Sequence, residues 1–169
     1  YDPTRPDAAP QPWRYPAPGQ ANADVRMAIL RADGTGEPVW VKWDRKRYPY
    51  LATVRWPSAG PLTLVVQDRA QQEALLLAVD PATGATRVLH TERDPAWLNL
   101  DQSVPRWLDD GSGFLWSTER DGAWALELRD ASGALVRTLT TAEDGYRSLA
   151  SLEAGQAWFL GGSEPTESH

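Results

Sequence analysis

The stretch FLWSTERDGAWALELRDASGALVRTL (114–139) decides the fold, because apolar runs alternate in it with the turn pairs Asp121-Gly122 and Ser132-Gly133. Phe114 and Trp116 alternate with smaller or polar residues, which is the period of a strand with one buried face. Asp-Gly suits the positive φ angles of a hairpin turn. The stretch therefore predicts antiparallel strands at about 113–118, 123–129 and 134–139, preceded by another at 104–108.

The same pattern occurs earlier in the chain. DPATGATRVLHT (80–91) and DASGALVRTLTT (130–141) are one motif, a hairpin turn that leads into an outer strand. Trp56 and Trp107 also correspond, and the offsets between matched residues stay between 49 and 51. A repeat of about fifty residues with four short strands is typical of a β-propeller blade.

The repeat predicts an all-β fold, a partial β-propeller of antiparallel four-stranded blades, with about two full blades and two half blades. A closed propeller needs at least about four blades, so we expect a piece of a larger protein. The predicted units are a Pro-rich extended segment or edge strand (1–24), the last two strands of a blade (25–47), two blades (48–94 and 95–142) and the first strands of a further blade (143–169).

Composition excludes several classes of protein. The net charge of −6 argues against a nucleic-acid partner. The alternative is that the basic and aromatic segment that begins with Lys42, Trp43 and Arg45 binds single-stranded nucleic acid. The absence of cysteine excludes disulfides and thiolate zinc sites. No apolar run is long enough for a membrane span. We predict no metal and no cofactor, and we interpret 109–113 as a hairpin turn rather than a calcium loop.

Three groups of residues carry a resemblance to a known family. They are R-Y-P-x-x-G-x-x-N at 14–22, W-x-N-L at 97–100 and S-x-E-R-D-G at 117–122. In this order they resemble the N-terminal β-propeller of the dipeptidyl peptidase IV family, within the prolyl oligopeptidase group of serine peptidases. The resemblance covers nearly the whole chain from Arg14 onward.

The resemblance implies a non-catalytic propeller region of a serine exopeptidase that releases N-terminal dipeptides of the Xaa-Pro or Xaa-Ala type. The region would gate and shape access to a separate α/β-hydrolase domain of the same parent chain. The parent protein would act on peptide substrates and form a homodimer. The alternative is a stand-alone propeller that serves as an interaction module without peptidase activity. The family resemblance and the Arg- and Ala-rich composition favour a bacterial protein in the periplasm or secreted.

We predict no catalytic residue in this chain. A serine peptidase needs a nucleophile, a base and an acid, and the histidines here are only His90 and His169. His90 lies in a predicted outer strand and is expected at the surface, while His169 is the last residue. The segment GGSEP (161–165) lacks the closing glycine of a nucleophile elbow.

The segment WLNLDQSVP (97–105) is the candidate functional site. It joins the outer strand of one blade to the inner strand of the next, and such connections lie on one face of a propeller. The resemblance implies that this face meets the substrate, with Trp97, Asn99 and Asp101 as lining residues. The alternative is an ordinary loop pinned by Trp97 in an apolar pocket. Trp56, Trp107 and Trp116 recur at strand positions and are predicted to pack in the core between blades.

Overall fold

The computed structural model describes Thr4, Gly19 and residues 21–162, and these residues contain strands and one short 3-10 helix. The strands are β1 (Ala28–Ile29), β2 (Val39–Trp40), β3 (Tyr50–Arg55), β4 (Leu62–Gln67), β5 (Glu73–Val79), β6 (Thr86–Arg93), β7 (Arg106–Trp107), β8 (Gly113–Thr118), β9 (Ala125–Asp130), β10 (Leu135–Thr138), β11 (Tyr146–Glu153) and β12 (Gln156–Gly161). Most of the predicted Pro-rich segment 1–24 lies outside the described residues.

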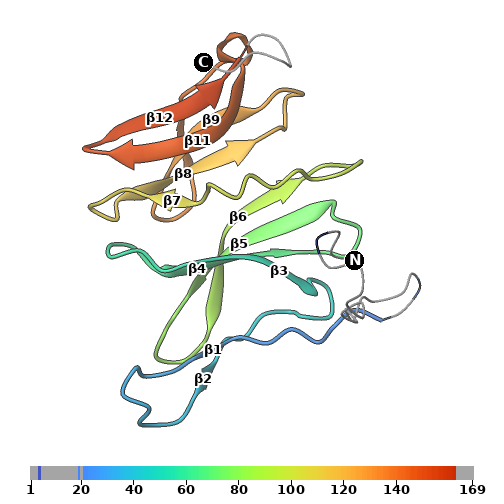
Figure 1. The fold of residues 1–169 in the computed structure, drawn as a ribbon, viewed down its shortest axis with the longest axis vertical. Helices are drawn as coiled ribbons and strands as arrows, with labels where there is room; N and C mark the ends of the chain where they lie inside the picture. Colours follow the sequence, from blue (N-terminus) through green and yellow to red (C-terminus); the bar gives the residue numbers. More distant parts are fainter. Residues whose placement is uncertain (1–3, 5–18, 20, 163–169) are drawn as a thin grey trace.

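The strands form two complete and two partial antiparallel sheets. Strands β3-β4-β5-β6 make one four-stranded sheet and β7-β8-β9-β10 make the next, each in sequence order. The hairpin β1-β2 precedes them and the hairpin β11-β12 follows. Figure 1 shows the four sheets succeeding one another along the long axis of the molecule, from β1-β2 at one end to β11-β12 at the other. The meander predicted from residues 114–139 is confirmed.

Strand position within a sheet explains the burial of each strand. Every residue of β4 and of β8 is buried, because each strand is paired on both sides and covered on both faces by neighbouring sheets. The outer strand β10 is exposed along its whole length. This difference is what a stack of radial sheets produces, since the second strand of each sheet lies inside the stack.

The core consists of two apolar clusters, one on each side of the first complete sheet. One cluster contains Val41, Leu64 and Val66 and joins that sheet to the β1-β2 hairpin. The other contains Leu76, Trp107 and Phe114 and continues toward β11 and β12. Trp107 and Phe114 lie cross-strand with ring centroids 5.0 Å apart.

Two glycines at repeated positions let adjacent sheets approach closely. Gly84 ends the turn D-x-x-x-G at 80–84 and Gly133 ends the turn D-x-x-G at 130–133, with φ of +69° and +97°. A Cβ at Gly84 would lie 2.0 Å from the Trp40 carbonyl oxygen, and one at Gly133 would lie 1.8 Å from the Leu89 carbonyl oxygen. The repeated turn motif therefore forms a repeated contact between sheets, called a turn joint, in which the turn of one sheet touches the outer strand of the preceding sheet.

The core prediction is confirmed for two tryptophans and wrong for the third. Trp107 and Trp116 are buried, whereas Trp56 is 61% exposed. Trp107 is the last paired residue of β7 and lies opposite Phe114, but Trp56 comes one position after Arg55, the last paired residue of β3. Because side chains alternate between faces, a slip of one residue carries the Trp56 indole out of the core.

The surface prediction for His90 is also wrong. His90 does lie on the outer strand β6, but its side chain is only 10% exposed. Its ring packs edge-on against Trp116 at 5.4 Å between ring centroids, so the next sheet covers it.

Candidate functional site

The segment between β6 and β7 is fixed to a neighbouring turn by backbone and side-chain hydrogen bonds. The backbone N–H groups of Asp94 and Leu98 donate to the carbonyl oxygens of Gln72 and Gln71, at 3.0 and 2.8 Å. The Gln72 side chain donates in turn to the carbonyl oxygen of Pro95 at 2.7 Å. These bonds attach the segment to the β4-β5 turn, so residues 94–98 are ordered. Residues 94–99 and the neighbouring Glu119 are called the rim below.

Trp97 and Asn99 both present their side chains at this rim. Trp97 is 53% exposed and Leu98 is 6% exposed, so Leu98 rather than Trp97 anchors the segment in the core. Asn99 Nδ2 donates a 2.8 Å hydrogen bond to Glu119 Oε2, which lies beyond the end of β8. Both residues line a small cleft together with Arg93. The rim therefore offers an exposed indole beside an amide–carboxylate pair.

Asp101 points inward and holds three parts of the fold together. Its Oδ2 accepts hydrogen bonds from Ser117 Oγ on β8 at 2.7 Å and from the Tyr146 hydroxyl on β11 at 2.9 Å. Its Oδ1 accepts from the Ser103 backbone N–H at 2.8 Å and from Ser103 Oγ at 2.5 Å. Burial raises the pKa of Tyr146, which therefore stays protonated and able to donate. Trp97 and Asn99 point outward, whereas the Asp101 carboxylate points inward and positions the chain behind the rim.

A buried carboxylate that the sequence analysis did not single out lies beneath the rim. Glu92 on β6 accepts hydrogen bonds from Trp116 Nε1 at 2.9 Å and Thr118 Oγ1 at 3.0 Å, both on β8. His90 Nε2 lies 3.0 Å from Glu92 Oε2. Burial alone would raise the pKa of Glu92, but these hydrogen bonds and the charge of His90 outweigh burial and lower it. Glu92 therefore joins the two complete sheets as an ionised acceptor.

A second buried carboxylate continues the network across β9. Glu127 accepts from Arg129 Nη2 at 2.6 Å and from Arg120 Nη2 at 3.3 Å. Arg120 also lies near Glu92, with 3.9 Å between Nε and Oε1. The S-x-E-R-D-G hairpin thus supplies a cation between two buried carboxylates.

The asparagine of the motif at 14–22 reaches the same end of the sheet. Asn22 Oδ1 accepts a 2.8 Å hydrogen bond from Arg69 Nη1 in the β4-β5 turn and lies 3.5 Å from the Tyr50 hydroxyl. That turn also holds the rim. Asn22 and Leu98, from two different sequence motifs, therefore attach to one turn.

The described residues hold no arrangement typical of serine-peptidase chemistry. In this part of the chain the His90 side chain is hydrogen-bonded to Glu92 and to no serine hydroxyl. His169 and most of the GGSEP segment lie outside the described residues. Residues 21–162 also contain no group of three His, Cys, Asp or Glu side chains placed to hold a metal ion. What the rim can do chemically is contact a ligand through Trp97, Asn99 and Glu119.

Two further features bear on partners. In the basic segment 42–47, Arg45 pairs with Asp24, and Arg47 Nη2 lies 2.8 Å from Glu73 Oε2, so carboxylates neutralise part of its charge. The part of the chain that the structure describes has no helix long and apolar enough to cross a membrane.

Four-stranded antiparallel sheets in sequence order, stacked face to face with repeated turn joints, define a partial β-propeller. A sequence model described as the dipeptidyl peptidase IV (DPP IV) N-terminal region matches residues 1–169. The chain belongs to this family.

The crystal structures similar to the chain include two of dipeptidyl peptidase type by their descriptions. Porphyromonas gingivalis dipeptidyl peptidase 4 is 20% identical, with a TM-score of 0.77 over 89% of this chain and 22% of that one. A Bacteroides ovatus protein described as a dipeptidyl aminopeptidase IV is 26% identical, with a TM-score of 0.62 over 72% of this chain and 17% of that one. The chain thus spans about a fifth of the length of these structures.

Proposed function

We propose that this chain is a non-catalytic propeller region of a serine exopeptidase that releases N-terminal dipeptides of the Xaa-Pro or Xaa-Ala type. In this proposal it gates and shapes access to a separate α/β-hydrolase domain of the same parent chain. The observation that carries the proposal is the match of residues 1–169 to the N-terminal region of the dipeptidyl peptidase IV family. The parent would act as a homodimer.

The geometry of the rim supports a gating role. Trp97 offers an exposed apolar surface, and Asn99 with Glu119 offers donors and acceptors to a peptide backbone. Asp101, behind them, ties the rim to β8 and β11. A rim built in this way can contact a peptide without rearranging, which lowers the entropic cost of binding.

The experiment is a pair of rim substitutions in the full-length protein that contains this chain. We expect Trp97→Ala and Asn99→Ala each to lower kcat/KM for Gly-Pro-p-nitroanilide by about tenfold, corresponding to about 1.4 kcal/mol of lost binding to the transition state. Trp158→Ala is the matched control, because Trp158 is 61% exposed on β12 and does not line the rim cleft.

The outcomes separate the two functional hypotheses. Loss of kcat/KM in the rim variants with an unchanged control supports gating at the rim. Cleavage that is equal in all variants contradicts a rim that meets substrate. A full-length protein that cleaves neither Gly-Pro- nor Ala-Ala-p-nitroanilide favours the interaction module.

A further inference from the structure

A pocket of about 390 Å³ lies between the first strands of the two complete sheets, and Trp97, Asn99 and Glu119 do not line it. Its lining comes from two chain segments, the end of β3 with the following turn and the segment around β7. In a propeller the first strand of each blade is the inner one, and the blades surround a central channel. The pocket is therefore on the channel side of the blades.

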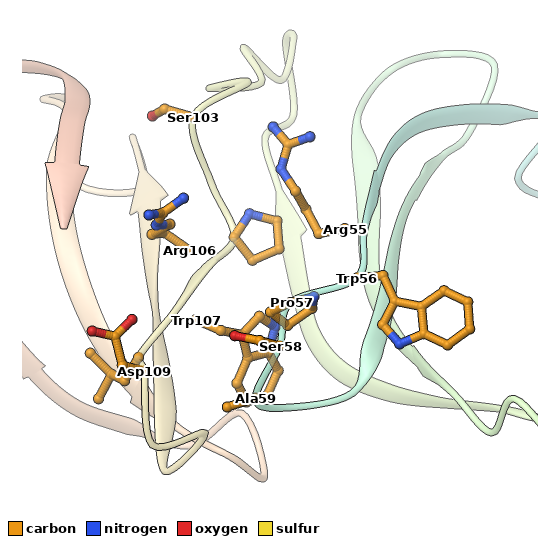
Figure 2. A pocket seen from close by; sticks show the side chains of 11 residues that line it. Arg55, Trp56, Pro57, Ser58, Ala59, Ser103, Arg106, Trp107 and Asp109 are labelled. Carbon is orange, nitrogen blue, oxygen red and sulfur yellow. The ribbon is translucent and has the colours of Figure 1, made fainter. Parts of the chain in front are cut away.

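Two arginines at matched positions of the repeat line this pocket. Arg55 precedes Trp56 and Arg106 precedes Trp107, with the same offset of 51 residues. Both arginines line the same pocket from neighbouring segments. Figure 2 shows the Arg55 side chain and the Trp56 indole pointing in different directions. Two cationic groups thus share one hollow in a chain whose net charge is −6.

Neither arginine is neutralised by a carboxylate in the described part of the chain. Arg55 Nη2 donates to the Gln102 carbonyl oxygen at 2.6 Å, which fixes its position and leaves its charge unpaired. The Arg106 guanidinium has no hydrogen bond or ion pair with any described residue. Asp109 also lines the pocket but forms no ion pair with either arginine.

Trp107, which also lines the pocket, has a buried donor without an acceptor. Trp107 is buried, and its Nε1 donates no hydrogen bond to the described residues. A buried donor without a partner costs about 1–3 kcal/mol, so a nearby acceptor would be favoured. The pocket thus holds two guanidinium groups without a carboxylate partner against one carboxylate, Asp109, and this excess of positive charge favours an oxyanion.

We propose that Arg55 and Arg106 form a carboxylate-binding subsite on the channel side of the propeller, which takes an acidic side chain or the C-terminal carboxylate of a peptide. The choice of a peptide as ligand rests on the proposed function. Arginine suits this role because its planar fork binds both oxygens of a carboxylate at once. A positive pocket in an acidic chain also attracts anionic segments over a distance.

The test is saturation-transfer NMR on the full-length protein with three acetylated tetrapeptides. Ac-Gly-Gly-Gly-Glu-amide carries only a side-chain carboxylate, Ac-Gly-Gly-Gly-Gln with a free C-terminus carries only a terminal one, and Ac-Gly-Gly-Gly-Gln-amide carries none. Acetylation blocks the amino terminus, so a dipeptidyl peptidase would not cleave these probes. We expect at least one carboxylate peptide to bind, and the difference between the first two identifies the source of the carboxylate.

Two substitutions connect the binding to the pocket. Arg106→Ala should weaken the Kd of the bound peptide by about tenfold, and Arg106→Lys should weaken it less because the charge remains while the fork is lost. Arg87→Ala is the control, since Arg87 is an exposed arginine on the outer strand β6 and does not line the pocket. Arg106 is also exposed, so these variants leave the core intact.

Three results would overturn the proposal: equal binding of the uncharged peptide, no effect of Arg106→Ala, or an equal effect of Arg87→Ala. Absence of binding by both carboxylate peptides would overturn it as well. Cleavage of Gly-Pro-p-nitroanilide by the unsubstituted protein tests the proposed function separately, because that substrate has no carboxylate. Failure of the proposed carboxylate subsite is therefore distinguishable from failure of the proposed peptidase function.

Discussion

Trp116 Nε1 donates a 2.9 Å hydrogen bond to Glu92 Oε2, and this bond joins β8 of one blade to β6 of the preceding blade. Both residues are almost fully buried, with Glu92 5% and Trp116 3% exposed. A buried carboxylate is tolerated only when it is hydrogen-bonded, so the contact between the blades depends on this donor.

We predict that Trp116→Phe lowers the free energy of unfolding by about 1.5–3 kcal/mol, the usual cost of losing a hydrogen bond to a charged group. Denaturant unfolding of the full-length protein measures the change. Trp158→Phe is the control and should change stability by less than about 0.5 kcal/mol, because Trp158 is exposed. Equal effects of the two substitutions would show that the bond to Glu92 contributes nothing measurable.

The pKa of Glu92 predicts how stability depends on pH. Its pKa in the folded protein lies below the ordinary value of 4.5. The unfolded state then binds more protons, so the stabilisation is complete above about pH 4.5 and is lost as the pH falls through the lower folded pKa. Glu92→Gln should be less stable than the unsubstituted protein at pH 7, and the difference should shrink toward acidic pH. A difference that stays constant with pH would contradict the assignment.

The turn joints predict a steric effect at Gly133. A Cβ there would overlap the Leu89 carbonyl oxygen, and the φ of +97° disfavours any other residue. Gly133→Ala should therefore destabilise the protein by on the order of 3–5 kcal/mol. Gly122→Ala is the matched control, because Gly122 also has a positive φ but has no atom within 4 Å of the added Cβ. The control should cost only about 1–2 kcal/mol, and equal costs would disprove the close joint.

Asp101 predicts a structural effect at the rim. Asp101→Asn replaces one carboxylate oxygen by an amide donor, so the bonds from Ser103, Ser117 and Tyr146 cannot all be kept. We expect a loss of about 1–3 kcal/mol in the free energy of unfolding. Asp109→Asn serves as the control, since Asp109 is exposed and accepts no side-chain hydrogen bond in the described residues. Full stability in Asp101→Asn would argue against its positioning role.

The sequence predicted the blades because turn pairs and strand periodicity are local signals. The repeated motif predicted the turns before the outer strands, whereas the close approach of Gly84 and Gly133 to the preceding sheet is evident only in the structure. Trp56 was misjudged because ladder register depends on the exact turn length, which the repeat offset alone does not determine. Glu92 was missed because its partners Trp116 and Thr118 come from another sheet, and the end of its own strand, HTER (90–93), is polar throughout, as an exposed strand would be.

The candidate site was predictable only in part, because the partners of its side chains come from other sheets. The sequence predicted that 97–105 connects two blades, but it did not distinguish the outward Trp97 from the buried Leu98 beside it. The partners of Asp101 lie on β8 and β11, outside its own segment. Direction and partners of a loop side chain depend on tertiary contacts, which local patterns do not encode.

The most direct test of the central claim is a dipeptidyl-p-nitroanilide assay on the full-length protein and on the 169-residue chain alone. We expect the full-length protein to cleave Gly-Pro- or Ala-Ala-p-nitroanilide and the 169-residue chain to cleave neither, because catalysis would belong to a separate domain. Cleavage by the 169-residue chain would contradict a non-catalytic propeller region.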